Sequence, residues 1–297
     1  MRNFDYNRLK YCKWDGEVLG LIGAIHEYKG RQELFLRQKP AALDKLVEIA
    51  KVQSTESSNK IEGVVTTATR IKQLCSQKTT PRNRDEEEIS GYRDALSLIQ
   101  ENYDYIPIKP SYILQLHKVL YGYSQRDIGG RFKNTQNYIA ETGDNGTQII
   151  RFMPLAPYET PMAVEAIFES YNREADNGEV DPLILIPAFI LDFLCIHPFN
   201  DGNGRMSRLL TTLLLYRAGY AVGKYVSLES KIEKTKAGYY DALGKSDVNW
   251  DRGENDITPF IKYLLKIVLA AYREFEEKVT ITEGKVSAAG MVRKAVY

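Results

Sequence analysis

The sequence predicts a mainly helical protein with one β-hairpin inserted between its helices. Apolar residues recur mostly at three- and four-residue spacing, which is typical of helices that bury one face. Several of these periodic segments begin with proline or serine, which are common at the start of a helix. One short region breaks the pattern, because two runs of strand-forming residues flank an Asp-Asn-Gly turn signal.

The predicted helices follow one another along most of the chain. The first, Pro40–Ala50, opens with a proline and places its large apolar residues near one side. The second, Asp85–Tyr103, begins with an acidic run that suits the positive end of a helix dipole. The same spacing predicts helices over Pro110–Gly122, Pro161–Asp176, Pro182–Ile196, Asn203–Ala218, Ser230–Leu243 and Thr258–Val279.

The predicted hairpin consists of short strands at Asn137–Ile139 and Ile149–Phe152. An exposed edge of such a hairpin can pair with an extended peptide by strand addition. A hairpin that only covers the core fits the same residues, and the sequence leaves both interpretations open.

Composition excludes several classes of protein. With 297 residues and 43% hydrophobic content, the chain can bury a substantial core. Its 40 Lys and Arg residues balance 39 Asp and Glu residues, which argues against a nucleic-acid-binding role. The three cysteines, Cys12, Cys75 and Cys195, have neither disulfide-framework nor zinc-ligand spacing, so we expect ordinary thiols.

The chain shows no sign of a membrane segment. Its first residues lack the charged end and apolar run of a signal peptide. The most apolar stretch, Leu183–Cys195, is short and contains Pro187 and Asp192. We therefore expect a cytoplasmic protein that does not bind membranes.

The segment HPFNDGNGRMSR, from His197 to Arg208, has the parts of a phosphate-binding site. Pro198 disfavours helical geometry at His197 and so ends the apolar helix before it. Gly202 and Gly204 allow a tight turn with exposed N–H groups, which suits an anion. A new helix starts there, and its positive N-terminus faces the same anion.

Four side chains of this segment suggest a reaction. Arg205 and Arg208 are three residues apart, so both can grip successive phosphates. Asp201 beside a polyphosphate is a typical Mg²⁺ ligand, and His197 can accept a proton near neutral pH. A lone histidine is usually structural and a lone Gly-x-Gly is usually a turn. Their conjunction in one short segment favours transfer of a nucleotide to a hydroxyl.

The segment resembles the signature of the Fic (filamentation induced by cAMP) family at every defined position, and the resemblance extends over roughly Ser54–Val279. It implies a Fic-type helical bundle with a hairpin flap. It also implies an adenylyltransferase, which moves AMP from ATP to a Ser, Thr or Tyr hydroxyl of a target protein or of itself. The chain lacks a Walker-type phosphate loop, which argues against an ordinary P-loop kinase or ATPase.

The resemblance assigns a role to each residue of the signature. His197 is the base, Asp201 holds Mg²⁺, and Phe199 packs the loop against the core. The two arginines bind the phosphates, with Arg205 on the leaving pyrophosphate and Arg208 on the γ-phosphate. The residues implied in the anion-binding loop are Gly202, Asn203 and Gly204, and Asn203 joins His197 and Arg205 in the catalytic group.

Two other regions fit this resemblance. Tyr240 and Leu243 match positions that contact adenine, although plain core packing also explains their spacing. Some relatives carry asparagine at the place of Asp247, which puts adenine contacts on that side in doubt. The flap near residues 136–152 matches the position where a target protein docks.

A segment upstream resembles the inhibitory motif of the family. If Ser58–Gly63 is helical, Ser58 and Glu62 lie on one face and Gly63 ends the helix. Glu62 would then pair with Arg208 and occupy the space of the γ-phosphate. The alternative is a solvated helix with an ordinary carboxylate.

These inferences divide the chain into an N-terminal helical lobe, a Fic core and a tail. The lobe, residues 1–110, carries the inhibitory helix at about 54–63, and the core covers 111–280. The tail, 281–297, loses the apolar periodicity and is either a frayed end or the start of a missing C-terminal domain. A homodimer that holds the inhibitory helix in place is compatible with the resemblance.

Two alternative functions stay open. The chain could use another donor, transferring phosphocholine or UMP, or could remove AMP. It could also be the nucleotide-sensing part of a regulator whose DNA-binding domain is the missing one.

Overall fold

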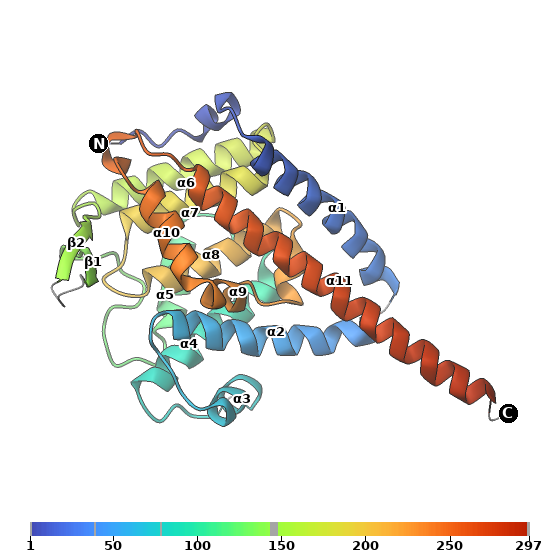
Figure 1. The fold of residues 1–297 in the computed structure, drawn as a ribbon. Helices are drawn as coiled ribbons and strands as arrows, with labels where there is room; N and C mark the ends of the chain where they lie inside the picture. Colours follow the sequence, from blue (N-terminus) through green and yellow to red (C-terminus); the bar gives the residue numbers. More distant parts are fainter. Residues whose placement is uncertain (1, 39, 78, 143–147, 296–297) are drawn as a thin grey trace.

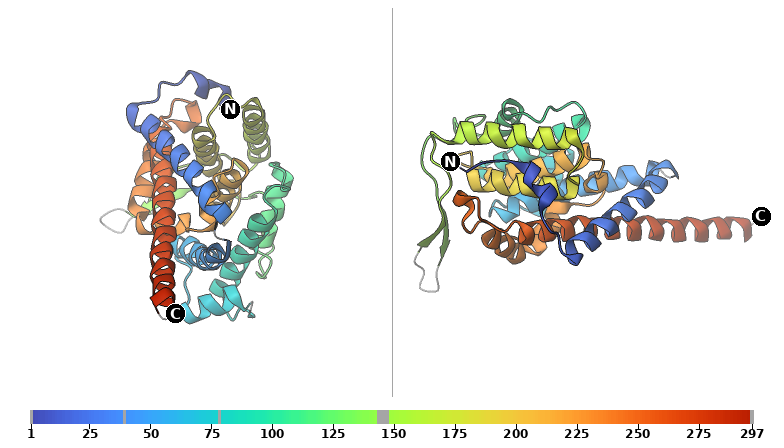
Figure 2. Two further views of the ribbon diagram at one scale, coloured as in Figure 1. Left: turned by 90° about the vertical axis from the view of Figure 1, so that its right-hand side faces the viewer. Right: turned by 90° about the horizontal axis from the view of Figure 1, so that it is seen from above.

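The computed structural model describes residues 2–38, 40–77, 79–142 and 148–295. Within these ranges it describes the side chains except at 37–42, 140–142, 148–149 and 281–295. In these ranges the fold is mainly helical, with helices packed around two central ones and a two-stranded sheet at one end (Figure 1). The two strands lie at the end of the molecule away from the C-terminus, as the two further views in Figure 2 also show. The predicted fold class is confirmed.

The structure places its elements in the following order along the chain. They are η1 (Tyr6–Tyr11), α1 (Gly16–Gln38), α2 (Pro40–Ile61), α3 (Ala68–Ser76), α4 (Arg84–Asn102), α5 (Pro110–Leu120), β1 (Ile139–Thr142), β2 (Gln148–Phe152), α6 (Thr160–Asn177), α7 (Pro182–Ile196), α8 (Asn203–Arg217), η2 (Ala221–Lys224), α9 (Leu228–Lys234), α10 (Lys236–Ser246), η3 (Trp250–Arg252) and α11 (Thr258–Ala295).

Two differences concern helices near the N-terminus. Helices α1 and α3 are not among the predicted segments. Helix α2 runs without a break to Ile61, so it joins the helix predicted over Pro40–Ala50 to the one predicted at about 54–63. Helix α1 is stabilised by packing against α11, which lies beside it in Figure 1. Such tertiary contacts stabilise a helix even where the spacing of its apolar residues is too irregular to predict it from sequence.

A third difference divides the helix predicted over Ser230–Leu243. The structure has two helices, α9 and α10, which meet at Thr235. The Thr235 hydroxyl donates a hydrogen bond to the Lys231 carbonyl at 2.8 Å. Threonine side chains that bond to the preceding turn compete with continued helical hydrogen bonding, which accounts for the break.

The strands pair in antiparallel register, with Glu141 opposite Ile149 and Thr142 opposite Gln148. Strand β1 starts at Ile139, two residues later than predicted. Before it, the Asn137 side-chain amide donates to the Phe199 carbonyl at 3.0 Å. The predicted Asp-Asn-Gly turn lies outside the described residues.

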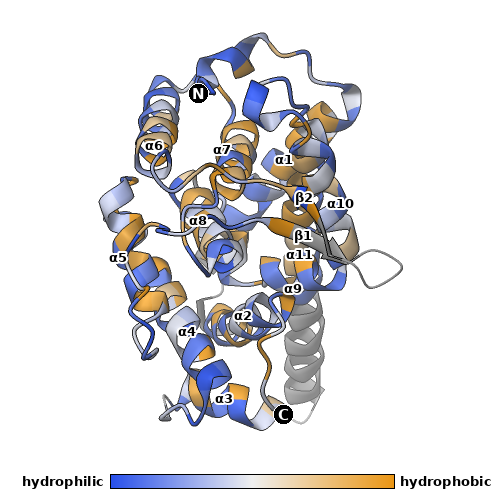
Figure 3. Ribbon diagram, turned by 90° about the vertical axis from the view of Figure 1, so that its left-hand side faces the viewer, coloured by the Kyte–Doolittle hydropathy of each residue, from blue (hydrophilic) through white to orange (hydrophobic). Residues whose placement is uncertain are grey.

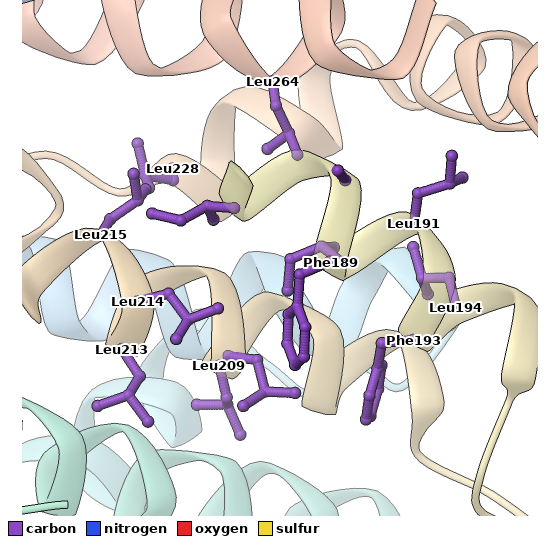
Figure 4. Close-up of a cluster of buried hydrophobic side chains, with 14 of the residues drawn as sticks. Phe189, Leu191, Phe193, Leu194, Leu209, Leu213, Leu214, Leu215, Leu228 and Leu264 are labelled. Atoms are coloured by element: carbon purple, nitrogen blue, oxygen red, sulfur yellow. The ribbon is translucent and has the colours of Figure 1, made fainter. Parts of the chain in front are cut away.

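The core forms between α7 and α8. Every residue of α7 from Leu183 to Ile196 is buried, and α8 is buried along most of its length. Figure 4 shows Phe189 and Phe193 of α7 beside leucines of α8, with Leu228 and Leu264 from α9 and α11 above them. In Figure 3 these two helices lie inside the molecule, and the surrounding helices carry both hydrophilic and hydrophobic residues. The short loop between α7 and α8 is thus anchored at both ends.

Helix α2 buries polar residues near its C-terminus. Ser58 and Asn59 are fully buried against the core. The helix ends in a Schellman motif, in which the Val64 N–H donates to the Asn59 carbonyl and the Gly63 N–H donates to the Lys60 carbonyl, both at 3.0 Å. Gly63 has φ +80°, so the prediction that it ends the helix is confirmed. Glu62 is the last residue before this turn.

Helix α11 continues to Ala295, past the predicted end at Val279. No helix within the described ranges is both long and apolar enough to span a membrane.

Candidate active site

His197 directly follows α7 and has an unusual backbone conformation. Its φ and ψ are 52° and 64°, in the left-handed region, which is uncommon for a residue with a side chain. The ring Nδ1 lies 3.3 Å from the Leu194 carbonyl. Because a carbonyl can only accept, Nδ1 carries the proton and Nε2 keeps a lone pair that can accept one. This tautomer suits a general base.

The His197 ring is neutral at physiological pH. Burial lowers its pKa from 6.5 to about 4, because the charged ring loses its hydration. The Leu194 carbonyl acts in the opposite direction, and the positive charge of Lys133 lowers the pKa further.

Phe199 anchors the loop by stacking on a second histidine. Its ring is fully buried and lies parallel to that of His117, with centroids 3.8 Å apart. The Gly130 N–H donates to His117 Nδ1 at 3.0 Å, so Nε2 carries the proton and donates to the Asp201 carbonyl at 3.1 Å. Burial lowers the pKa of His117 to about 4, which keeps it in this neutral form. His117 therefore orients the loop from α5.

Asn203 closes the loop on itself. Its side-chain oxygen accepts from the Phe199 N–H at 2.9 Å, and its amide donates to the Phe199 carbonyl at 2.7 Å. The side chain is almost fully buried. The structure thus shows Asn203, predicted in the catalytic group, fastening the turn that carries His197.

We expect Asn203→Ala to lower the free energy of unfolding by about 1–3 kcal/mol, because it leaves the buried Phe199 N–H without a partner. The Phe199 carbonyl keeps its hydrogen bond from the Asn137 amide. Urea denaturation followed by circular dichroism measures this change. Asn177→Ala, at an exposed asparagine at the end of α6, is the control and should shift the midpoint much less. Equal shifts in the two variants would show that Asn203 does not fasten the loop.

Arg208 is held by the end of α2. Its Nε donates to the Ser58 hydroxyl at 2.8 Å, and Nη2 donates to the Ser58 carbonyl at 2.9 Å and to Glu62 Oε1 at 2.7 Å. The arginine side chain is 4% exposed and the glutamate 32%. The predicted pairing of Glu62 with Arg208 is present in the structure.

The charge on Glu62 is stabilised by its surroundings. Burial by itself raises the pKa of this carboxyl, but the Arg208 guanidinium outweighs burial, so the pKa lies below the ordinary value. The carboxylate also lies close to Gly204, where a Cβ would overlap it. A side chain at Gly204 is therefore incompatible with this position of Glu62. The Lys236 amine donates to the Ile61 carbonyl at 2.6 Å and secures the same helix end from α10.

Arg205 points to a different set of partners. Its Nη1 lies 2.7 Å from the Glu88 carboxylate, and its Nη2 donates to the Tyr121 hydroxyl at 2.9 Å. The Nε donor is buried and has no hydrogen-bond partner among the described residues. The two arginines thus diverge, since Arg208 meets Glu62 while Arg205 meets α4.

Asp201 lies in a cluster of arginines. Its Oδ2 is 2.9 Å from Arg126 and 4.0 Å from Arg84, and its Oδ1 accepts from the Gly202 N–H at 2.7 Å. Burial raises the pKa of the carboxyl, but the arginines and the Gly202 N–H lower it more, so Asp201 is ionised at neutral pH. The buried carboxylate of Glu88 shares Arg84 and Arg126 with it.

A cavity of about 500 Å³ brings together His197 and the pair of Arg208 with Glu62, whereas Asp201 and Arg205 are not among the residues that line it. Its polar wall includes His197, Gly204, Arg208 and Glu62, and this volume falls in the range of small-molecule sites. The remaining lining residues are Ile139, Arg151, Phe152, Leu194, Cys195, Tyr239, Tyr240, Leu243 and Asp247.

The predicted base-contacting residues line this cavity from α10. Tyr240 is 42% exposed and Leu243 is buried. Asp247 is paired with Arg151 of β2 at 2.7 Å, so this side of the cavity carries an ion pair. Tyr239 and Phe152 complete an apolar wall next to them.

Sequence reasoning missed several residues of the site. His117, Tyr121 and Glu88 come from helices or loops far from the signature in sequence, and Arg126 comes from the segment after α5. A histidine or glutamate within a helix-like apolar pattern is only a weak sign of a functional site, because the sequence does not show which residues its side chain contacts.

The site therefore combines a buried loop between two central helices with an arginine that pairs with a glutamate at a helix end. Residues 107–215 match the model described as the Fic/DOC family, so the chain contains a Fic domain. The match covers α5 through most of α8, which includes the whole signature loop.

Curated relatives support the same family. A protein adenylyltransferase fic-1 from Caenorhabditis elegans is 28% identical over 188 residues, which cover 62% of this chain and 32% of the relative. A protein adenylyltransferase Fic from Culex quinquefasciatus is 27% identical over 232 residues, 75% of this chain and 41% of the relative. The chain thus spans a third to two fifths of the length of these relatives.

Solved structures confirm the fold. A Fic domain containing signaling protein from Bacteroides thetaiotaomicron matches with a TM-score of 0.72 at 24% identity, covering 86% of this chain and 98% of the other. Fic-1 from C. elegans matches with a TM-score of 0.70 at 20% identity, covering 89% and 73%.

Proposed function

We propose that the chain transfers AMP from ATP to a Ser, Thr or Tyr hydroxyl of a target protein, and that Glu62 inhibits this reaction. The arrangement of one cavity carries the proposal: a neutral His197, the paired Arg208 and Glu62, and the wall of α10 line the same space. Relatives named protein adenylyltransferases support the choice of reaction.

In this mechanism ATP lies with its base against Tyr240 and Leu243 and its phosphates at the loop. The N-terminus of α8 stabilises their negative charge. His197 Nε2 accepts the proton of the target hydroxyl as the oxygen attacks the α-phosphorus and pyrophosphate leaves. Arg208 neutralises charge on the leaving phosphates once Glu62 has moved away.

Asp201 fits the role of a Mg²⁺ ligand. Among the described residues no group of three or more His, Cys, Asp or Glu side chains could hold a metal, but Mg²⁺ at polyphosphates commonly uses one or two carboxylates with phosphate oxygens and water. The ionised, 37% exposed Asp201 has this chemistry, and Arg126 at 2.9 Å balances its charge. A bound Mg²⁺ would neutralise charge on the phosphates.

We place the target protein at the hairpin near 136–152. Tyr138, Ile150 and Met153 are each more than half exposed there. Exposed apolar side chains beside a strand edge suit docking of an extended peptide.

The donor is tested with Glu62→Gly protein, Mg²⁺ and cell lysate, supplied with ATP labelled at the α-phosphate, UTP labelled in the same position, or CDP-choline labelled in its choline. We expect protein-bound label from ATP above that from the other donors. Label from UTP or CDP-choline alone would overturn the choice of ATP. ATP binding by calorimetry without label from any donor would instead support a sensing role.

A further inference from the structure

The segment 133–137 is hydrogen-bonded to the backbone of the signature loop. The Lys133 amine donates to the Ile196 carbonyl at 2.9 Å, and the Lys133 N–H donates to the Pro198 carbonyl at 2.8 Å. The Asn137 amide donates to the next carbonyl, that of Phe199, at 3.0 Å. Lys133 thus holds the chain immediately before and immediately after His197.

Side chains extend the same connection. The Asn200 amide donates to the Asn134 side-chain oxygen at 2.9 Å, and the Thr135 hydroxyl donates to the Asn200 side-chain oxygen at 3.1 Å. The Asn137 side-chain oxygen accepts from the Lys133 amine at 3.2 Å. This segment therefore contacts the loop at several successive residues, and β1 begins two residues after Asn137, at Ile139.

The backbone at His197 needs such support. A residue with a Cβ in the left-handed region is disfavoured by roughly 1 kcal/mol or more and persists only where its surroundings fix it. Among the described non-glycine residues, only His197 and Asn249 have positive φ. The two Lys133 hydrogen bonds end on the carbonyls of Ile196 and Pro198, the residues on either side of His197 in the chain.

The positive charge of Lys133 also affects the protonation of the His197 ring. Its side chain is 3% exposed, and burial lowers its pKa to about 8. Its charge disfavours the protonated form of His197, whereas the carboxylates of Glu62 and Asp201 favour it. Arg208 lines the same cavity as His197.

We propose that Lys133 is a positioning residue for His197: it fixes the left-handed turn that places the ring in the wall of the cavity. The proposal rests on the proposed AMP transfer for its kinetic part and on the geometry of the loop for its structural part.

The experiment compares Lys133→Met and Lys133→Arg in the Glu62→Gly protein. In Lys133→Met, kcat for AMP transfer should fall roughly 10- to 100-fold with little change in the KM for ATP, since a misplaced base costs rate and not nucleotide binding. Lys133→Arg keeps a cationic donor and should restore most of kcat. Lys109→Met, at an exposed lysine, is the matched control.

The titration of His197, followed by NMR of the imidazole protons, gives a readout independent of transfer. The chain has three histidines, so His197→Ala identifies the signal. Removing the positive neighbour should move the His197 titration to higher pH in Lys133→Met, and Lys133→Arg should titrate as its parent does. A kcat and a titration equal to those of Lys109→Met would overturn the proposal.

The experiment distinguishes failure of the proposed AMP transfer from failure of the proposed role of Lys133. If Glu62→Gly transfers no AMP, the proposed function fails, while a His197 titration that Lys133→Met leaves unchanged would by itself overturn the proposal for Lys133. If Lys133→Met does not fold, Asn137→Ala removes a second contact of the same segment. That variant should lower kcat in the same direction, and an unchanged kcat in folded Asn137→Ala would also overturn the proposal.

Discussion

Glu62→Gly is expected to raise AMP transfer by roughly 10- to 100-fold, in the range of typical coupling free energies between an inhibitory contact and a ligand. The carboxylate occupies the guanidinium edge of Arg208 that a phosphate would bind. Its removal frees this edge, while two hydrogen bonds to Ser58 still hold the arginine in place. The substitution should therefore change the site without disordering it.

Two measurements check this result: label transferred from α-labelled ATP, and the Kd for ATP by calorimetry. Both should improve in Glu62→Gly. Glu56→Ala, which removes an exposed carboxylate from α2, is the control and should behave as the wild type does. If Glu62→Gly binds ATP and transfers AMP no better than this control, the ion pair with Arg208 is structural only.

His197→Ala, made in the Glu62→Gly protein, is expected to abolish most transfer, with a fall of about 10²- to 10⁴-fold in kcat. The ring is neutral near pH 7, and its Nε2 is available to accept the proton of a hydroxyl. His197 is not among the residues proposed to bind the phosphates of ATP. The Kd for ATP should therefore change little.

The control is His26→Ala, which removes a half-exposed histidine and should leave transfer unchanged. Retained transfer in His197→Ala would exclude it as the base. Loss of ATP binding together with transfer would instead mean that His197 supports the structure of the loop, and circular dichroism would then show whether the fold has changed.

The sequence was sufficient to predict the loop and its partner helix end. The signature is contiguous, so His197, Gly204 and Arg208 lie near one another for local reasons. Glu62 is far away in sequence, but its own short motif indicated it, and the structure brings it to Arg208. The helices were predictable where apolar spacing was regular, as in α7 and α8.

What could not be predicted depends on tertiary packing. The stacking of His117 on Phe199 and the ion pair of Glu88 with Arg205 join residues far apart in the chain. The same holds for Lys133, whose amine has no local reason to bind the Ile196 carbonyl. The divergence of Arg205 from Arg208 also follows from these distant partners, although their three-residue spacing suggested a common target.

The position of Glu62 at a capped helix end has a consequence for how the inhibition responds to conditions. Inhibitor and site belong to one chain, so the carboxylate acts at a fixed effective concentration. Diluting the protein will not weaken this contact, unlike one supplied by a separate molecule. Relief needs only a local transition, either a rotation of the partly exposed Glu62 side chain or the unwinding of the final turn of α2 away from the Lys236 amine and Ser58. A ligand that binds the released helix end more tightly than the capped one would therefore act as an activator, and a ligand that prefers the capped end would strengthen the inhibition.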